Sequence, residues 1–371
     1  MYIIKNIKAV PIKTESIGNF EQHRKSFVSV VVSAYNEALI LTKNLSILCE
    51  YMTSLEDEYR WEMIIVNDGS ADKTGDLAEA FAMTRDNVHV LHHMYNFRLG
   101  QALRFAFNNC QGDYVVVMDL DLSYSPDHIE KLLAKIKETR AKIVIASPYM
   151  KGGKVSNVPW LRRTLSIWAN RFLSFNAKSN LSTLTSMVRA YDGKFLSTLN
   201  LKSMDMEINA EIIYKAEVLR ARIVEIPGHL DWGFQKTDGI KRRSSMRIFK
   251  SITSYLFFGF IFRPFIFFMF PGLVLMLFSI YTLMHVAGYI VVHFQSLPAS
   301  FGSVDYRFGA AVAAAFNMSP HAFIVGGISL MVAIQLISLG ILSLQSKRYF
   351  EELFHMGTTI YKNNREDHRK Q

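Results

Sequence analysis

The feature that most constrains this 371-residue chain is a long apolar stretch at residues 264–346. Within it, Asp305 and Arg307 are the only charged side chains. A helix of about 20 consecutive apolar residues is enough to cross a bilayer. The stretch can hold two such helices, and we predict them at 264–292 and 321–345. The alternative is a pair of buried helices in a soluble protein, but charge-free runs of this length are rare there.

The positive charge of the chain, formally +10, is concentrated beside this stretch. Residues 241–263 contain six basic side chains, no acid and several aromatic residues, and we predict an amphipathic segment at the membrane interface. Lys347 and Arg348 follow the second predicted span. Because basic flanks stay on the cytoplasmic side, we predict an integral membrane protein whose N-terminal domain and tail, at 347–371, are cytoplasmic. A nucleic-acid binder usually spreads basic residues over its folded domain, so we expect no nucleic-acid partner.

Residues 27–240 have the pattern of a separate α/β domain, preceded by an N-terminal extension at 1–26. Runs rich in Val and Ile alternate with helical patterns, which is typical of a mostly parallel sheet covered on both faces. The predicted strands are 27–33, 61–67, 87–91, 113–118, 141–146 and 221–226. The predicted helices are 36–54, 74–84, 100–110, 126–139 and 206–219. Ligands of such sheets bind at the carboxyl ends of the strands, so the residues just after each strand are the site candidates.

Carboxylates follow three of these strands. Glu37 and Asp68 come after the first and second, and Asp119 and Asp121 come after the fourth. Two carboxylates one residue apart can share Mg²⁺ or Mn²⁺, which prefers oxygen ligands and bridges protein groups to phosphates. The glycine motifs of dinucleotide-binding oxidoreductases and of P-loop nucleotide hydrolases are absent from the sequence, which argues against both classes.

Three segments of the chain resemble the opening blocks of glycosyltransferase family 2, whose fold is called GT-A. They are VVSAYNEALI, IIVNDGSADKT and GQALRFAFNNCQGDYVVVMDLDLSYSPDHIEKLL, and the resemblance extends over residues 27–250. The most similar branch contains dolichyl-phosphate mannose synthases and polyprenyl-phosphate glucosyltransferases. The resemblance implies an inverting transfer of a hexose from a UDP- or GDP-sugar to a lipid phosphate, with a divalent metal as cofactor.

The same resemblance implies roles for matched residues. Those expected to line the nucleotide-sugar pocket are Ser33, Tyr35, Glu37, Asp68, Asp119, Asp121, Ser123 and Arg243. Among them, Asp119 and Asp121 would hold the metal and the diphosphate. The segment WLRRTLS at 160–166 resembles one that grips the lipid phosphate, and its candidates are Arg162, Arg163 and Ser166.

This sequence departs from the family pattern at two places, which leaves the sugar and the acceptor open. Relatives carry an arginine where this chain has Pro148, and a different segment where it has residues 184–189. Arg189 could supply a charge to the site or be a surface residue.

Three other interpretations stay open. The acceptor could be a hydroxyl group, such as that of a lipid-linked sugar, which needs a carboxylate base. Asp205 and Glu207 lie where relatives of that kind place theirs, although acidic residues there also stabilise the start of a helix.

The chain could be a non-catalytic membrane scaffold, but the intact carboxylates argue against that. A homo-oligomer is compatible with the membrane anchor. A processive polysaccharide synthase is disfavoured, because the sequence has no Gln-x-x-Arg-Trp segment.

Overall fold

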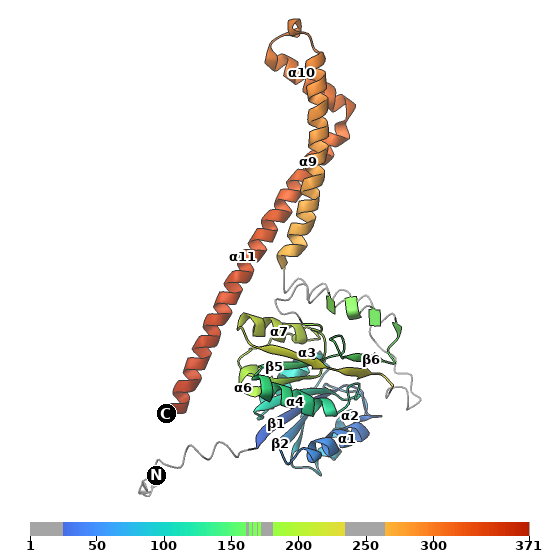
Figure 1. Cartoon of the computed structure of the whole chain (residues 1–371), viewed down its shortest axis with the longest axis vertical. Coiled ribbons are helices and arrows are strands. Elements are labelled where there is room, and N and C mark those ends of the chain that lie inside the picture. The colour runs from blue at the N-terminus through green and yellow to red at the C-terminus, as the bar shows by residue number, and fades with distance from the viewer. Residues whose placement is uncertain are drawn as a thin grey trace. The chain divides into compact units, whose positions relative to one another are not determined.

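The computed structural model describes most of the chain, in two compact units (Figure 1). The described residues are 25–160, 163, 164, 166–168, 170, 171, 181–233 and 264–370. The first unit holds those up to Val158, those of Ser186–Ile208 and those from Arg222 to Gly233, and the second holds the others. The predicted interfacial segment at 241–263 and nearly all of the predicted extension at 1–26 lie outside the described residues.

The first unit is built on a seven-stranded sheet with the strand order β3-β2-β1-β4-β7-β5-β8. The strands are β1 (Ser26–Ala34), β2 (Tyr59–Asn67), β3 (Val88–His92), β4 (Tyr114–Asp119), β5 (Ile143–Ser147), β7 (Arg189–Asp192) and β8 (Ile223–Pro227). A separate parallel pair consists of β6 (Lys154–Ser156) and β9 (His229–Asp231). Neighbouring strands of the large sheet are parallel, except that β7 runs antiparallel to β4 and β5. The predicted mostly parallel α/β sheet is therefore confirmed.

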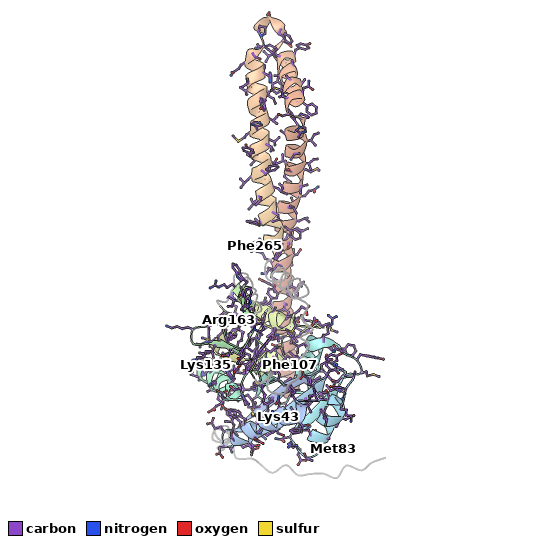
Figure 2. All side chains as sticks on the ribbon, turned by 90° about the vertical axis from the view of Figure 1, so that its right-hand side faces the viewer. Lys43, Met83, Phe107, Lys135, Arg163 and Phe265 are labelled. Carbon is purple, nitrogen blue, oxygen red and sulfur yellow. The ribbon has the colours of Figure 1, made fainter. Side chains whose placement is uncertain are left out.

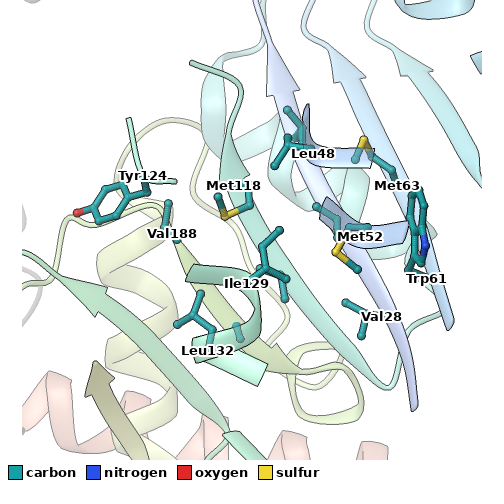
Figure 3. Close-up of a cluster of buried hydrophobic side chains, with 14 of the residues drawn as sticks. Val28, Leu48, Met52, Trp61, Met63, Met118, Tyr124, Ile129, Leu132 and Val188 are labelled. Carbon is teal, nitrogen blue, oxygen red and sulfur yellow. The ribbon is translucent and has the colours of Figure 1, made fainter. Parts of the chain in front are cut away.

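Helices pack on both faces of the sheet, and its strands are therefore buried. They are α1 (Leu41–Ser54), α2 (Thr74–Ala82), α3 (Arg98–Asn109) and α4 (Asp127–Thr139), with a short α6 (Gly193–Leu196). Every second residue of β1, including Val28, joins a core with α1 and α4, to which Leu48, Met52 and Leu132 contribute (Figure 3). The side chains of α3 are absent from this cluster, and α3 packs against β1 and β2. This layering brings the carboxyl ends of β1, β2 and β4 to one edge of the sheet.

Strand β7 is the element of the sheet that was not predicted from the sequence. It begins at Arg189 and accounts for the position of this residue. Its side chain is fully buried, so the interpretation of Arg189 as a surface residue is wrong. The guanidinium donates from Nε to the carbonyl oxygen of Ser186 at 2.6 Å. Burial lowers the pKa of this group, and hydrogen bonding to Tyr191 partly offsets that effect. Arg189 is therefore a satisfied core residue within the sheet.

Besides the partly described helical residues between 160 and 171, the second unit contains four helices and a short 3₁₀ turn among its described residues. They are α7 (Ile208–Val218, which begins at the unit boundary), α9 (Pro264–Ser296), η3 (Ala299–Phe301), α10 (Val304–Met318) and α11 (Pro320–Lys370). The helices α9 and α11 lie side by side and run in opposite directions, joined through α10 (Figure 2). By length and composition, Phe265–Ser296 and Pro320–Ile360 could each cross a membrane. Only 11% of the most apolar window of each helix is buried, which differs from the buried core helices of a soluble protein.

Small residues bring α9 and α11 close together. Ser279 Oγ donates to the carbonyl oxygen of Gly326 at 2.7 Å, and both groups are within the apolar helices. A Cβ atom added at Gly326 would lie 2.7 Å from Thr282 Oγ1, so a larger residue does not fit there. Close backbone approach at glycine is a common way for helices to associate in lipid, where the hydrophobic effect does not drive them together.

The C-terminal helix α11 also packs on α7. The rings of Tyr214 and Phe350 stack with centroids 6.1 Å apart, and Lys347 Nζ lies 5.4 Å from the Tyr214 centroid. On α7 itself, Lys215 forms an ion pair with Glu211 at 2.6 Å, and Lys215 is nearly buried. The residues predicted to form a tail after the second span thus continue α11 without a break, and the first of them contact α7.

We expect Leu48→Ala to destabilise the first unit by about 2–5 kcal/mol, because it leaves a cavity in a fully buried site on α1. Leu39→Ala is the matched control, since Leu39 is 74% exposed and its removal should change stability by less than about 0.5 kcal/mol. Chemical unfolding of the two purified variants, compared with the wild type, measures both values. Equal effects of the two substitutions would contradict the described core.

Gly326→Leu should weaken the association of α9 with α11, because its side chain would collide with Thr282. Gly327→Leu is a control of the same size, since nothing lies within 4 Å of a Cβ atom added at Gly327. We expect Gly326→Leu alone to lower the thermal unfolding midpoint of the detergent-purified protein by several degrees. A larger loss in Gly327→Leu would show that the helices meet through another face.

Candidate functional site

The strand register places the predicted site residues at one edge of the sheet. Ser33, near the end of β1, pairs with Asp119 at the end of β4, and Ala34 pairs with Asn67 at the end of β2. Asp68 follows β2 directly and donates its backbone N–H to the carbonyl oxygen of Ala34 at 3.0 Å. The structure therefore brings Ser33, Asp68 and Asp119 to adjacent strand ends, as the sequence predicts.

The turn after β4 holds Asp119 and Asp121 close together. Ser123 contacts both carboxylates: its N–H donates to Asp121 Oδ1 at 3.0 Å, and its hydroxyl donates to Asp119 Oδ2 at 3.4 Å. Leu122 adopts a left-handed backbone conformation with φ of 51°, which is uncommon for a residue with a branched side chain. Asn44 on α1 donates to the carbonyl oxygen of Leu120 at 2.9 Å and so attaches the turn to α1. The tight turn is thus fixed by side chains that are largely buried.

This arrangement concentrates negative charge. Burial and, to a smaller extent, the neighbouring charge of Asp121 raise the pKa of Asp119 to about 7, while the hydrogen bond from Ser123 acts in the opposite direction. Two carboxylates held this way are stabilised by a cation placed between them and a substrate phosphate. The donor set fits a hard divalent ion. Among the described residues no cluster of three or more His, Cys, Asp or Glu side chains is found that could hold a metal. Asp119 and Asp121 would therefore share the ion with substrate oxygens and water.

The loop after β1 is tied to the loop after β2 through polar contacts. Asn36, with a left-handed φ of 54°, accepts from the N–H of Ala71 at 2.8 Å and donates its own N–H to Ser70 at 3.0 Å. The N–H of Glu37 donates to Thr74 Oγ1 at 2.8 Å. Asn36 and Thr74 were not among the predicted site residues, because they connect two loops that are distant in sequence. Of the predicted pocket residues on this loop, Tyr35 is 47% exposed and Glu37 is half-buried.

Asp68 is buried, and its partner is a histidine that the sequence analysis did not select. His93 Nδ1 lies 2.7 Å from Asp68 Oδ1, and the N–H of Phe97 donates to the same oxygen at 3.0 Å. The exposed fraction of each side chain in the Asp68–His93 pair is below one tenth. The position of His93 just after β3 is the signal that could have pointed to it, since β3 is adjacent to β2 in the sheet.

The two candidate bases differ in their surroundings. Asp205 Oδ2 forms an ion pair with Arg98 Nη1 at 2.9 Å, and its Oδ1 accepts from the N–H of Met206 at 2.9 Å. Glu207 Oε2 is buried and has no hydrogen-bond partner among the described residues. The ion pair of Asp205 with Arg98 therefore attaches the segment before α7 to the start of α3. Glu207 is the one of the two that has an unsatisfied acceptor.

The predicted acceptor residues belong to the second unit. Arg163 is exposed on a helical turn in which its N–H donates to the carbonyl oxygen of Pro159 at 3.0 Å (Figure 2). The carbonyl oxygen of Ser166 accepts from Asn170 Nδ2 at 2.9 Å, and Asn170 in turn contacts the segment 183–185. Arg162 and Arg243, the two other predicted arginines, lie outside the described residues.

Comparison with known proteins agrees with this geometry. The family model for glycosyl transferase family 2 matches residues 29–199. A polyprenol monophosphomannose synthase of Mycolicibacterium smegmatis is 31% identical over 194 residues, which cover 50% of this chain and 73% of that protein. An undecaprenyl-phosphate mannosyltransferase of Micrococcus luteus is 29% identical over 54% of this chain and 82% of its own length. A dolichol-phosphate mannosyltransferase of Pyrococcus furiosus is 29% identical over 62% of this chain and 61% of its own length.

Solved structures with a related sheet are more distant. Glucosyl-3-phosphoglycerate synthase from Mycobacterium tuberculosis, in complex with Mn²⁺, UDP and phosphoglyceric acid, is 18% identical with a TM-score of 0.43. It covers 56% of this chain and 69% of its own, and at this distance no residue role transfers from it. The family model and the Mycolicibacterium relative carry the assignment, and the mostly parallel sheet with carboxylates at its strand ends agrees with it. The chain belongs to glycosyl transferase family 2 and is a glycosyltransferase of the GT-A fold.

Proposed function

We propose that this glycosyltransferase moves a hexose from a nucleoside diphosphate sugar to a polyprenyl or dolichyl phosphate at the cytoplasmic surface of a membrane. The observation that carries the proposal is the pair Asp119 and Asp121, held together beside the end of β1, in a chain with two helices apolar enough to cross a bilayer. The names of its relatives support a lipid-phosphate acceptor, since they are transferases acting on polyprenol, dolichol or undecaprenyl phosphates.

The donor would bind at the strand ends. Ser33, Tyr35 and Glu37 of the β1 loop and Asp68 of the β2 loop would surround the nucleotide, and Ser123 donates hydrogen bonds to both carboxylates. Asp119 and Asp121 would hold Mg²⁺ or Mn²⁺, which neutralises charge on the departing diphosphate. Arg243, which lies outside the described residues, is a candidate for the same diphosphate on the resemblance of its segment alone.

The acceptor would bring its own negative charge. A phosphate oxygen is already anionic and attacks the anomeric carbon without a protein base, so positioning is the main task of the protein. Arg163, Ser166 and Arg162 are the candidates for that task, because arginine binds phosphate through paired hydrogen bonds. The charge distribution of the flanks supports a cytoplasmic site, with both termini on that side.

A second candidate function is supported by Glu207. A transferase that uses a hydroxyl acceptor needs a general base, and the buried Oε2 of Glu207 has a free acceptor site among the described residues. Asp205 is less suited to this role, because Arg98 is paired with it. A lipid-linked sugar is the acceptor class that this alternative requires.

The decisive assay incubates the detergent-purified full-length protein with Mn²⁺ or Mg²⁺, polyprenyl phosphate and a panel of UDP- and GDP-sugars. Mass spectrometry then detects the glycolipid. We expect a polyprenyl-phosphate sugar from the wild type, and a loss of roughly 10²-fold or more in Asp121→Ala, because transition-state charge is no longer neutralised.

The double variant Asp205→Asn with Glu207→Gln separates the two candidate functions. It should retain activity within a few-fold if the acceptor is a lipid phosphate, and lose nearly all activity if the acceptor is a hydroxyl group. A wild type that neither forms product nor binds a nucleotide in the presence of metal would instead favour the non-catalytic scaffold.

The raised pKa of Asp119 predicts how stability depends on pH. Its folded-state pKa of about 7 lies above the ordinary value of 3.8, so the folded protein binds this proton more tightly than the unfolded chain does. Stability is therefore lost as the pH rises from about 4 to 7 and the carboxylate becomes charged. Without divalent ions at pH 8, Asp119→Asn should be more stable than the wild type by on the order of 1 kcal/mol. Thermal unfolding between pH 4 and 8 measures the difference, which should vanish at the acid end.

Asp86→Asn is the control for this experiment, because Asp86 is an exposed carboxylate far along the chain from the β4 turn. It should change the unfolding midpoint little at any pH. If Asp119→Asn were less stable than the wild type at pH 8, the burial of a charged carboxylate beside Asp121 would not be the dominant influence on this turn.

A further inference from the structure

The contact between Asp68 and His93 is supported by more hydrogen bonds and ring contacts than simple packing requires. Their side chains are 6% and 9% exposed, and Nδ1 of the histidine lies 2.7 Å from Oδ1 of the aspartate. The residues come from the ends of neighbouring parallel strands, β2 and β3. The pair is thus part of the strand-end edge to which the proposed function assigns the nucleotide.

Aromatic rings fix the orientation of His93. Its ring stacks on Phe105 of α3, with centroids 5.1 Å apart and an interplanar angle of 16°. Phe97 meets it edge-on, with centroids 5.2 Å apart and an angle of 81°. The imidazole is therefore held on two sides, and its Nδ1 is directed at the carboxylate of Asp68.

The loop that carries these groups is held against the β2 loop. Gly69 has a left-handed φ of 64°, and a Cβ atom added there would lie 2.2 Å from the backbone carbon of Tyr95. The N–H of Phe97 donates to Asp68 at 3.0 Å. Only glycine permits this approach, so the segment from His93 to Phe97 is fitted closely to Asp68.

The hydrogen bonds to Asp68 are unevenly distributed. Both hydrogen-bond donors among the described residues, the His93 ring and the Phe97 N–H, act on Oδ1, and no described residue donates to Oδ2. An ionised carboxylate only accepts, so His93 must carry a proton on Nδ1 to form this bond. The histidine and the backbone together fix one oxygen and leave the other as an acceptor.

We propose that His93 is a positioning residue for the nucleobase: by fixing Oδ1 of Asp68, it presents Oδ2 to an N–H of the base. The inference rests on the proposed function, because it takes the donor to be a nucleoside diphosphate sugar. A fixed carboxylate oxygen accepts from the imide N–H of uracil or guanine. It faces the lone pair of the corresponding ring nitrogen in cytosine or adenine, which costs binding energy. His93 thereby sets a preference for UDP or GDP over CDP and ADP.

The experiment measures the binding of UDP, GDP, CDP and ADP to the full-length protein in detergent with Mn²⁺. We expect the wild type to bind UDP or GDP at least tenfold more tightly than CDP and ADP. His93→Ala should weaken the preferred nucleotide about tenfold and reduce the discrimination to within threefold, since Oδ1 then loses one of its two hydrogen-bond donors. In the transfer assay the same variant should raise KM for the sugar donor and leave kcat nearly unchanged.

Conservative variants separate positioning from packing. The amide nitrogen of asparagine can take the place of Nδ1, so His93→Asn should restore discrimination, whereas glutamine reaches further and His93→Gln should not. His89→Asn, at an exposed site on the same strand, is the control and should behave as the wild type. Thermal unfolding of each variant reports any loss of folding.

The outcomes distinguish the inference from the proposed function. If the wild type binds none of the four nucleotides, the proposed function fails. If it binds UDP or GDP selectively and folded His93→Ala keeps the same selectivity, the role of His93 is overturned and the proposed function stands. Equal behaviour of His93→Asn and His93→Gln would likewise overturn it, because it would show that the position of the donor atom is unimportant.

Discussion

Burial of the Asp119 carboxylate beside Asp121 is the constraint on which the site at the strand ends depends. Burial raises the pKa of Asp119, and the charge of Asp121 acts in the same direction. Hydrogen bonds from Ser123 and from Asn44 on α1 hold the turn in place. A divalent cation bound there with the substrate would offset the cost of charging this turn.

Much of the fold could be predicted from the sequence because its strands are continuous runs of Val and Ile bounded by polar residues. The predicted strands differ from those of the structure by one or two residues at most ends. Strand β7 was missed because its four residues, RAYD, contain a charge and have no apolar periodicity. Its place between β4 and β5 is set by tertiary pairing, and the burial of Arg189 depends on contacts that no local pattern reveals.

The candidate site was predictable where chemistry follows directly from position in the chain, as for the carboxylates at the strand ends. It was not predictable where contacts join distant segments. The pairing of Asp205 with Arg98 links residues that are 107 positions apart, so no local pattern of the sequence indicates it. His93 was assigned no role because the sequence has no third ligand at metal spacing beside His92 and His93. Its actual neighbours appear only once β2 and β3 are aligned.

The length of α11 has a mechanical consequence. An unbroken helix of 51 residues is about 75 Å long, more than twice the roughly 30 Å thickness of a hydrocarbon core. Bilayer thickness governs the tilt of a spanning helix. Because α7 packs on the same helix through Tyr214 and Phe350, and both helices belong to the second unit, a change in tilt would also move the part of α11 that contacts α7.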